Sequence, residues 1–181
     1  MTNQNRDQLC VFPTADFDPV VARWIWQLAD ARRLTLEKLT GISDTTLLWR
    51  PDAEANAIGT LLYHIVLIEL DWLYVEILER PDYISDAAIA MLLPYPDRDK
   101  TGRLTVIEGE TVQAHLDRMA AARQLLYGAL RPMAAEEFYR KRELENYDVT
   151  PEWVVYHLIQ HETEHRGEIA ELRRQAEFLC R

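Results

Sequence analysis

Three histidines recur at four-residue intervals near the end of the chain: His157, His161 and His165. Apolar residues around them are spaced by three and four positions, as on one buried helix face: Val154, Leu158, Ile169, Leu172 and Ala176. His161 and His165 fall on this stripe, whereas His157 falls roughly 80° from its centre. A buried imidazole without a partner costs a few kcal/mol. Because side chains four residues apart can share one ion, the pattern predicts that His161 and His165 bind a metal.

A third ligand is expected on another helix, because catalytic metal sites commonly use three protein ligands and keep one position open. His64 interrupts an apolar run, residues 61–68, and is the natural candidate. His115 lies just off the stripe of its own helix, so we expect a surface or rim histidine there. We assign His157 to a position beside the ligands or at the rim of the site. The predicted metal ligands are therefore His64, His161 and His165.

Three neutral imidazoles would leave the charge of a divalent ion uncompensated. Such an ion lowers the pKa of a bound water to about 7 in known zinc sites and deprotonates a bound thiol. Imidazole ligands suit zinc, nickel, copper and iron, and spacing alone does not choose among them.

Other interpretations of the histidines stay open at this point. A pair spaced by four residues also arises by chance on a solvated helix face, and His64 could be a core histidine bonded to a backbone or carboxylate partner. Glu162 and His165 have the Glu-x-x-His spacing of di-metal carboxylate bundles. Those bundles need two such pairs, and the helix around His64 supplies none.

Four long helical patterns must position these residues. They cover residues 19–39, 57–78, about 105 or 108 to 130, and 151 onward. Asp18 and Thr150 are suited to cap the first and last, each followed by proline. Residues 82–103 form a long connection, with one short helical turn over 87–92. We predict an all-α, up-down four-helix bundle with a long crossover between helices 2 and 3, with residues 1–15 as an N-terminal arm and residues 16–181 as a single domain.

Charge and composition limit the partners of the chain. A net charge of −10 over 181 residues repels phosphate backbones and anionic lipid, so we expect no nucleic acid and no membrane partner. The most apolar stretch, residues 61–78, carries four ionisable side chains, which favours a buried helix over a membrane span. The start of the chain lacks the pattern of a signal peptide. Cys10 and Cys180 form no CxxC pair, which fits a reducing cytoplasm.

Two stretches of the chain carry a family resemblance. Residues 49–51 (Trp-Arg-Pro) and 56–64 (NAIGTLLYH) resemble the segment that leads to the helix-two histidine of the DinB/YfiT-like metal-binding four-helix bundles. Residues 157–169 (HLIQHETEHRGEI) resemble their helix-four motif. The order of helices agrees as well, so the likeness spans residues 16–176.

The resemblance implies that His64, His161 and His165 bind one divalent metal, nickel or zinc. Many members have a histidine where this chain has Glu164, which we expect to point away from the core. Arg166 and Gly167 are implied to be structural, the glycine through close helix approach and the arginine by pairing across the bundle. Members often form homodimers, and some are thiol-dependent transferases.

The leading functional hypothesis is a metal-dependent transferase that adds a low-molecular-weight thiol to a small electrophilic molecule. Trp72, Tyr63 or Tyr156 could line its pocket, and Arg50 could meet an anionic substrate group. One alternative is a metal-dependent hydrolase that uses Asp71 or Glu168 as a proton shuttle. Another is a non-catalytic stress protein that binds a metal or a ligand.

Overall fold

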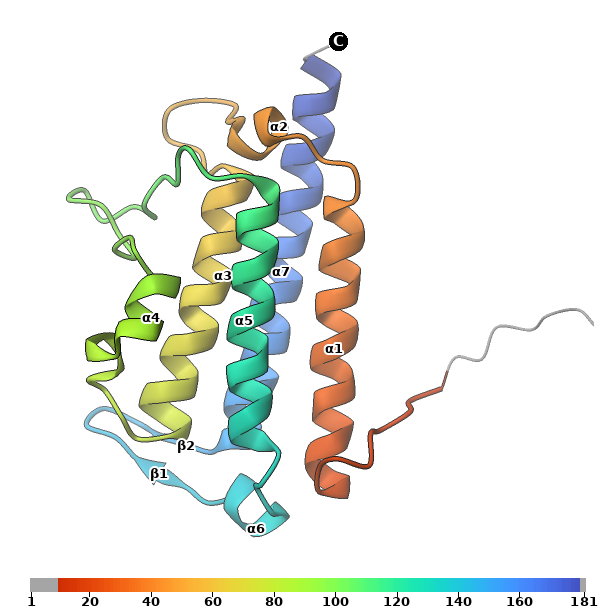
Figure 1. Cartoon of the computed structure of the whole chain (residues 1–181), viewed down its shortest axis with the longest axis vertical. Helices are drawn as coiled ribbons and strands as arrows, with labels where there is room; N and C mark the ends of the chain where they lie inside the picture. Colours follow the sequence, from red (N-terminus) through yellow and green to blue (C-terminus); the bar gives the residue numbers. More distant parts are fainter. Residues whose placement is uncertain (1–9, 180–181) are drawn as a thin grey trace, which may run out of the picture.

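Four long helices form the bulk of the computed structural model, which describes residues 10–179 (Figure 1). They are α1 (Pro19–Leu39), α3 (Ile58–Trp72), α5 (Val112–Leu130) and α7 (Pro151–Leu179). A π-helical segment, η1 (Leu73–Ile77), extends α3. The helix α3 packs against both α5 and α7, and α1 packs against α7. The predicted all-α four-helix bundle is confirmed.

The crossover between α3 and α5 returns along the length of the bundle. In Figure 1 the chain descends through α3, climbs through α4 (Ala87–Leu92) and its flanking loops, and descends again through α5. The helices α3 and α5 therefore run parallel, while α1 and α7 run in the opposite direction. The short helical turn that we predicted at residues 87–92 coincides with α4.

Four short elements join the long helices. They are α2 (Asp44–Leu48), η2 (a 3-10 turn, Tyr83–Ser85), α6 (Ala135–Phe138), and a hairpin of β1 (Arg142–Glu143) with β2 (Asp148–Val149). Arg142 pairs antiparallel with Val149 in that hairpin. The sequence analysis missed α2, α6 and the hairpin, because segments of two to five residues are too short to show a hydrophobic period.

The helix starts follow local capping chemistry. Asp18 accepts a hydrogen bond from the Val20 amide (2.9 Å), and Thr150 accepts one from the Trp153 amide (3.2 Å), as expected. The expected start of the third helix near residue 105 or 108 was wrong. Gly109 has a φ of 76°, which interrupts a right-handed helix, and α5 begins only after Thr111, whose hydroxyl caps Ala114.

The boundaries of the predicted arm and domain stay predictions. Residues 1–9 of the arm and Cys180 lie outside the described part of the chain. From residue 10 to residue 18 the chain forms no helix before α1 begins at Pro19.

The helix α3 with η1, over Ile58–Ile77, is long and apolar enough by composition to cross a membrane. In the bundle, 67% of its most apolar window is buried against the other helices. This burial is what a core helix of a soluble protein shows, in agreement with the sequence prediction for this stretch.

Four charged side chains meet in the middle of the bundle, one from each long helix. Arg32 (α1) donates to Glu162 (α7) and to Glu69 (α3), each at 2.7 Å. Arg123 (α5) donates to both oxygens of Glu69, at 2.9 and 3.0 Å, and to Glu162 at 2.9 Å. All four residues are buried, and we call them the charge network.

The charge network is balanced, with two guanidinium groups against two carboxylates. Burial alone would raise the pKa of Glu69, but Arg123 and Arg32 outweigh it and hold that pKa below its ordinary value. Burial alone would lower the pKa of Arg123, and Glu69 and Glu162 reverse that effect. The Nη1 groups of Arg32 and Arg123 also donate to the carbonyls of Met119 and Leu28, at 2.9 and 2.8 Å. Because each charge in the network is paired, removal of one charge leaves another buried and unpaired.

Gly59 of α3 packs closely against His115 of α5. A Cβ at Gly59 would lie 3.2 Å from Nε2 of His115, which is only 1% exposed. The expectation of a surface or rim histidine at position 115 was therefore wrong. The close approach implied for Gly167 was wrong too, since nothing lies within 4 Å of a Cβ built there.

The first prediction concerns the charge network. We expect Glu162→Gln to lower the free energy of unfolding by about 3–5 kcal/mol, because it leaves guanidinium charge unpaired in the core. The matched control is Glu164→Gln, two residues away on the same helix and exposed, for which a change within about 0.5 kcal/mol is expected. Urea denaturation of both variants measures the difference, and equal stabilities would contradict a structural role for the network.

The second prediction concerns the pH dependence of stability. Burial lowers the pKa of His115 to about 4, although Glu110 opposes the shift. The unfolded chain takes up this proton as pH falls through about 6.5, while the folded chain does not until about 4. The contribution of His115 is thus present above pH 6.5 and is lost as pH falls toward 4.

The amide variant His115→Gln removes that titration. For the metal-free protein we expect a shallower loss of stability between pH 6.5 and 4.5, by up to about 1.4 kcal/mol per pH unit. Denaturation curves at several pH values measure the slope. Equal slopes of the unfolding free energy against pH for the variant and the natural chain would rule out a lowered pKa for His115.

Candidate metal centre

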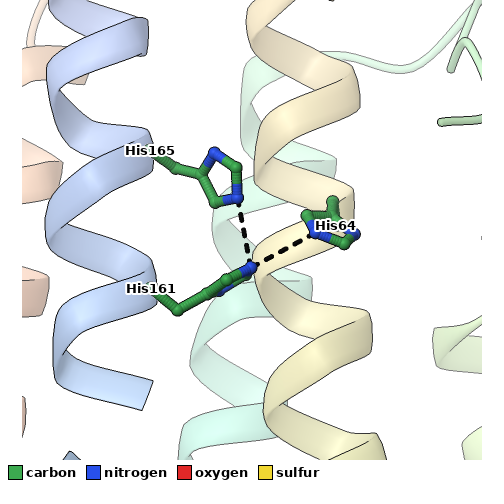
Figure 2. Close-up of side chains that lie close together, drawn as sticks. All are labelled: His64, His161 and His165. Atoms are coloured by element: carbon green, nitrogen blue, oxygen red, sulfur yellow. Dashed lines mark hydrogen bonds between the residues drawn. The ribbon is translucent and has the colours of Figure 1, made fainter. Parts of the chain in front are cut away.

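Three histidine rings from two helices converge on one point between α3 and α7 (Figure 2). Nε2 of His161 lies 3.2 Å from Nε2 of His64 and 3.1 Å from Nε2 of His165. One ligand nitrogen from each ring lies within 4.8 Å of the other two. The structure thus brings together all three residues that the sequence analysis proposed as ligands.

The spacing of these nitrogens fits a shared ion. Zinc–nitrogen bonds of about 2.0–2.1 Å in a tetrahedral site place neighbouring ligand nitrogens about 3.3–3.4 Å apart. The separations of 3.1 and 3.2 Å come close to that value. A hydrogen bond between two imidazoles needs one ring to donate, and three facing nitrogens cannot all be satisfied in this way. A divalent cation accepts a lone pair from each ring.

The outer nitrogen of His64 has a carboxylate partner. Nδ1 of His64 lies 3.2 Å from Oδ1 of Asp97, on the crossover between α4 and α5. With the proton on Nδ1, the lone pair of Nε2 points to the other two rings. A carboxylate behind a ligating imidazole is the usual arrangement at metal sites, because it fixes the tautomer and orients the ring. The sequence analysis did not single out Asp97, since no spacing rule connects it to His64.

Glu168 takes a similar place behind His165, but less firmly. Its Oε1 lies 3.2 Å from Nδ1 of His165, yet the two groups are not aligned for a hydrogen bond. The Glu168 side chain is 52% exposed, so the contact is a weak electrostatic one. The Glu168 carboxylate thus faces Nδ1 of His165, the nitrogen on the far side of the ring from the point where the three rings meet.

The imidazoles of His161 and His64 are held in their neutral, ligating form. Burial, together with His165, His64 and His157, lowers the pKa of His161 to about 3. Burial and the neighbouring His165 also lower the pKa of His64, and Asp97 offsets only part of this shift. Because a metal and a proton compete for the same lone pair, a lowered pKa leaves the nitrogen free for an ion at neutral pH.

The centre of the core stripe on α7 differs from the prediction. Glu162 is the side chain that reaches the middle of the bundle at this level, at 1% exposure, while His161 and His165 are half-buried at its flank. The apolar stripe positions on α7 are buried as expected: Val154, Leu158, Ile169, Leu172 and Ala176. Engagement of Glu162 in the charge network also removes the Glu-x-x-His pair that a di-metal site would need.

His157 lies beside the three rings and outside them. Its ring centroid is 5.9 Å from that of His161 and 4.5 Å from that of Trp72. This is the rim position that the sequence analysis gave it.

Of the four residues proposed to line a substrate pocket, the structure places only some near the three rings. Trp72 lines a cavity next to His157. Tyr63 is a core residue whose hydroxyl donates to the Tyr95 carbonyl (2.5 Å), and Tyr156 packs edge-on against Trp24. Arg50 donates to the Ala53 carbonyl at 3.5 Å, within its own loop. Trp72 is thus the one of the four with a place beside the site.

The charged residues singled out in the sequence, Asp71, Glu164 and Arg166, have different surroundings in the structure. Asp71 accepts a hydrogen bond from the Tyr83 hydroxyl at 2.8 Å, which occupies it away from the three rings. Glu164 is exposed, as expected. The pairing across the bundle that was expected of Arg166 belongs to Arg32 and Arg123 instead.

Comparison with known proteins identifies relatives by profile and by fold. The sequence profile of the DinB superfamily matches residues 27–169, a range that contains the three histidines. A crystal structure of a conserved protein from Enterococcus faecalis superposes with a TM-score of 0.66 at 18% identity, over 86% of this chain and 95% of that one. At this identity the likeness concerns the fold alone. No curated protein matches the sequence significantly.

The third prediction tests Asp97 as the residue that positions His64. We expect Asp97→Asn to weaken zinc or nickel binding about 10- to 100-fold, because an amide no longer favours the proton on Nδ1. Titration of the metal-free protein, followed by calorimetry, measures the affinity. Asp99→Asn, two residues along the same exposed loop, is the control. Equal affinities for the two variants would contradict the role given to Asp97.

Proposed function

This chain belongs to the DinB superfamily, and from that premise we propose that it is a metal-dependent transferase. In this proposal His64, His161 and His165 hold one divalent ion, zinc or nickel. A low-molecular-weight thiol and a small electrophilic molecule are the two substrates. The observation that carries the proposal is the convergence of three imidazole nitrogens at metal-ligand spacing.

The ligand set favours a reactive ion over a structural one. Within residues 10–179 no fourth histidine, cysteine or carboxylate joins the group of three. Closed structural zinc sites use four protein ligands, whereas catalytic sites use three and leave a position for substrate. A divalent ion held by neutral imidazoles alone keeps its charge and lowers the pKa of a thiol or water that reaches it.

The surrounding residues favour a thiol over water as the nucleophile. A hydrolase needs a side chain that takes up and returns a proton near the reacting centre. Of the two carboxylates suggested for that role, Asp71 accepts a hydrogen bond from the Tyr83 hydroxyl, and Glu168 has a weak contact with the outer nitrogen of His165. A thiol needs no separate base at such a centre, so thiol transfer makes fewer demands on this set of side chains.

The residues of the chain have defined tasks in this scheme. His64 is oriented by Asp97 from the crossover, and His161 and His165 are oriented by their places one turn apart on α7. The rings of Trp72 and His157 pack together beside His161, where in this scheme they would limit the access of water. The charge network fixes the rotation of α3 and α7 about their own axes, because Arg32 binds a glutamate on each of them.

Two further features belong to the proposal. A homodimer is expected for the chain, since members of the resembling family often pair. A cytoplasmic location would supply the thiol in its reduced form. Gel filtration with light scattering tests the first.

The fourth prediction is a metal- and thiol-dependent activity. With zinc or nickel bound, we expect the protein to speed conjugation of glutathione or cysteine to an electrophile such as 1-chloro-2,4-dinitrobenzene. We expect His161→Ala to lose the metal-dependent rate, because two imidazoles hold an ion far less firmly than three. Glu164→Ala, on the exposed side of the same helix, should keep it.

The outcomes separate the candidate functions. A conjugation rate equal to that of His161→Ala, over several thiols and electrophiles, would reject the transferase. Ester or amide hydrolysis that is lost in the same variant would favour the hydrolase. One bound ion with four protein ligands and no turnover would favour a non-catalytic metal-binding protein.

A further inference from the structure

A cavity of about 590 Å³ is lined by residues from the end of α3, the start of α7 and the β1–β2 hairpin. Its volume lies in the range of small-molecule sites, about 300–1,000 Å³. Three large rings line it, those of Trp72, Tyr147 and Trp153, together with Lys141 and Asp148. We call it the aromatic cavity. None of these residues is a candidate metal ligand, so the cavity is separate from the metal centre.

The rings of the aromatic cavity form a continuous array. The Trp72 centroid lies 5.3 Å from that of Trp153 and 6.3 Å from that of Tyr147. His157 stacks on Trp153 at 5.2 Å with 9° between the planes. Trp153 and Tyr147 are each 46% exposed. Large aromatic side chains that gather around a cavity and stay exposed commonly mark a binding site.

The charges around the cavity are mostly negative. The ammonium group of Lys141 lies 2.9 Å from carboxylate oxygens of both Asp148 and Glu143, so its positive charge is more than balanced. Behind the rings, the Tyr147 hydroxyl donates to Oε1 of Glu76 at 2.7 Å. The other oxygen of Glu76 is buried and has no hydrogen-bond partner in the described part of the chain.

Aromatic faces and surplus carboxylates together select one class of ligand. Ring faces carry negative electrostatic potential and attract cations within about 6 Å of the centroid, tryptophan most strongly. An anionic ligand would meet the carboxylate of Asp148, while the lysine that lines the cavity, Lys141, is already paired with Asp148 and Glu143. A neutral apolar ligand would gain from the rings but nothing from the carboxylates.

We propose that the aromatic cavity binds a small organic cation of the substituted ammonium type, with its charged group against the faces of Trp72 and Trp153. The carboxylates of Glu76 and Asp148 supply long-range attraction, and the rings replace the weak hydration of the alkylated nitrogen. A compact, strongly hydrated cation such as sodium binds poorly at such a surface.

The array also leads toward the metal centre. The His157 ring lies 4.5 Å from Trp72 and 5.9 Å from His161 by centroids. A molecule anchored by its cationic end in the cavity can therefore extend along His157 to the three imidazoles. This second step rests on the proposed function and would make the cavity the part of the site that selects the substrate.

The fifth prediction uses a pair of matched probes. Choline carries a trimethylammonium group, and 3,3-dimethylbutan-1-ol has the same shape without the charge. We expect the full-length protein to bind choline about tenfold or more tightly than the neutral alcohol, by calorimetry or tryptophan fluorescence. Because the metal is not part of the cavity, the metal-free and metal-loaded proteins should behave alike. Failure of the transferase assay therefore leaves this test intact, and the reverse also holds.

Variants separate the cavity from other sites. Trp153→Ala should weaken choline binding about tenfold or more, while Trp153→Phe keeps a weaker ring and part of the affinity. Trp49→Phe changes a half-buried tryptophan outside the cavity and should have no effect. Because Trp153 is 46% exposed, its variants are expected to fold, and circular dichroism checks this.

The overturning results are equally defined. Equal affinity for choline and the neutral alcohol would show an apolar cavity without preference for cations. Tighter binding of an anionic analogue, or choline binding unaffected by Trp153→Ala, would reject the proposal.

Discussion

Burial of four charges at one level of the bundle constrains everything around them. Glu69 and Glu162 must face Arg32 and Arg123 within hydrogen-bond distance, because an unpaired charge in this core costs several kcal/mol. An apolar core tolerates a sliding or rotated helix at modest cost, whereas a network of short, directed hydrogen bonds does not. With one member on each long helix, the charge network fixes the rotation and height of all four.

The metal centre depends on that rotation. At 100° per residue, His161 and His165 lie roughly 100° and 60° to the same side of Glu162. With Glu162 directed to the core, both imidazoles face α3. On α3 itself, Glu69 follows His64 by five residues and anchors the same helix. The three rings therefore meet because Glu69 and Glu162, on the same two helices, are already paired.

The end of the bundle that holds the aromatic cavity is built by elements that interrupt the regular helices. At Trp72 the helix α3 passes into the π-helical segment η1, a kind of turn that is frequent at functional sites. Glu76 lies within this segment, and Tyr147 reaches it from the hairpin that precedes α7. Arg142, fully buried, ties the hairpin to α6 through the Glu137 and Arg140 carbonyls. These contacts hold an aromatic wall in place next to the metal centre.

The sequence by itself determined the four helices and the three histidines, because a helical period and the i, i+4 spacing are properties of the local chain. The starts of α1, α4 and α7 follow from Asp18, Asp86 and Thr150, whose caps act within three residues. Only the tertiary structure decided which polar residues share the core. Arg32, Glu69, Arg123 and Glu162 are separated by up to 130 positions along the chain, and Asp97 likewise lies 33 positions from its partner His64. His115 is buried where α5 meets Gly59 of α3. Burial and pairing of charge depend on how helices pack, and no spacing within a single helix records that packing.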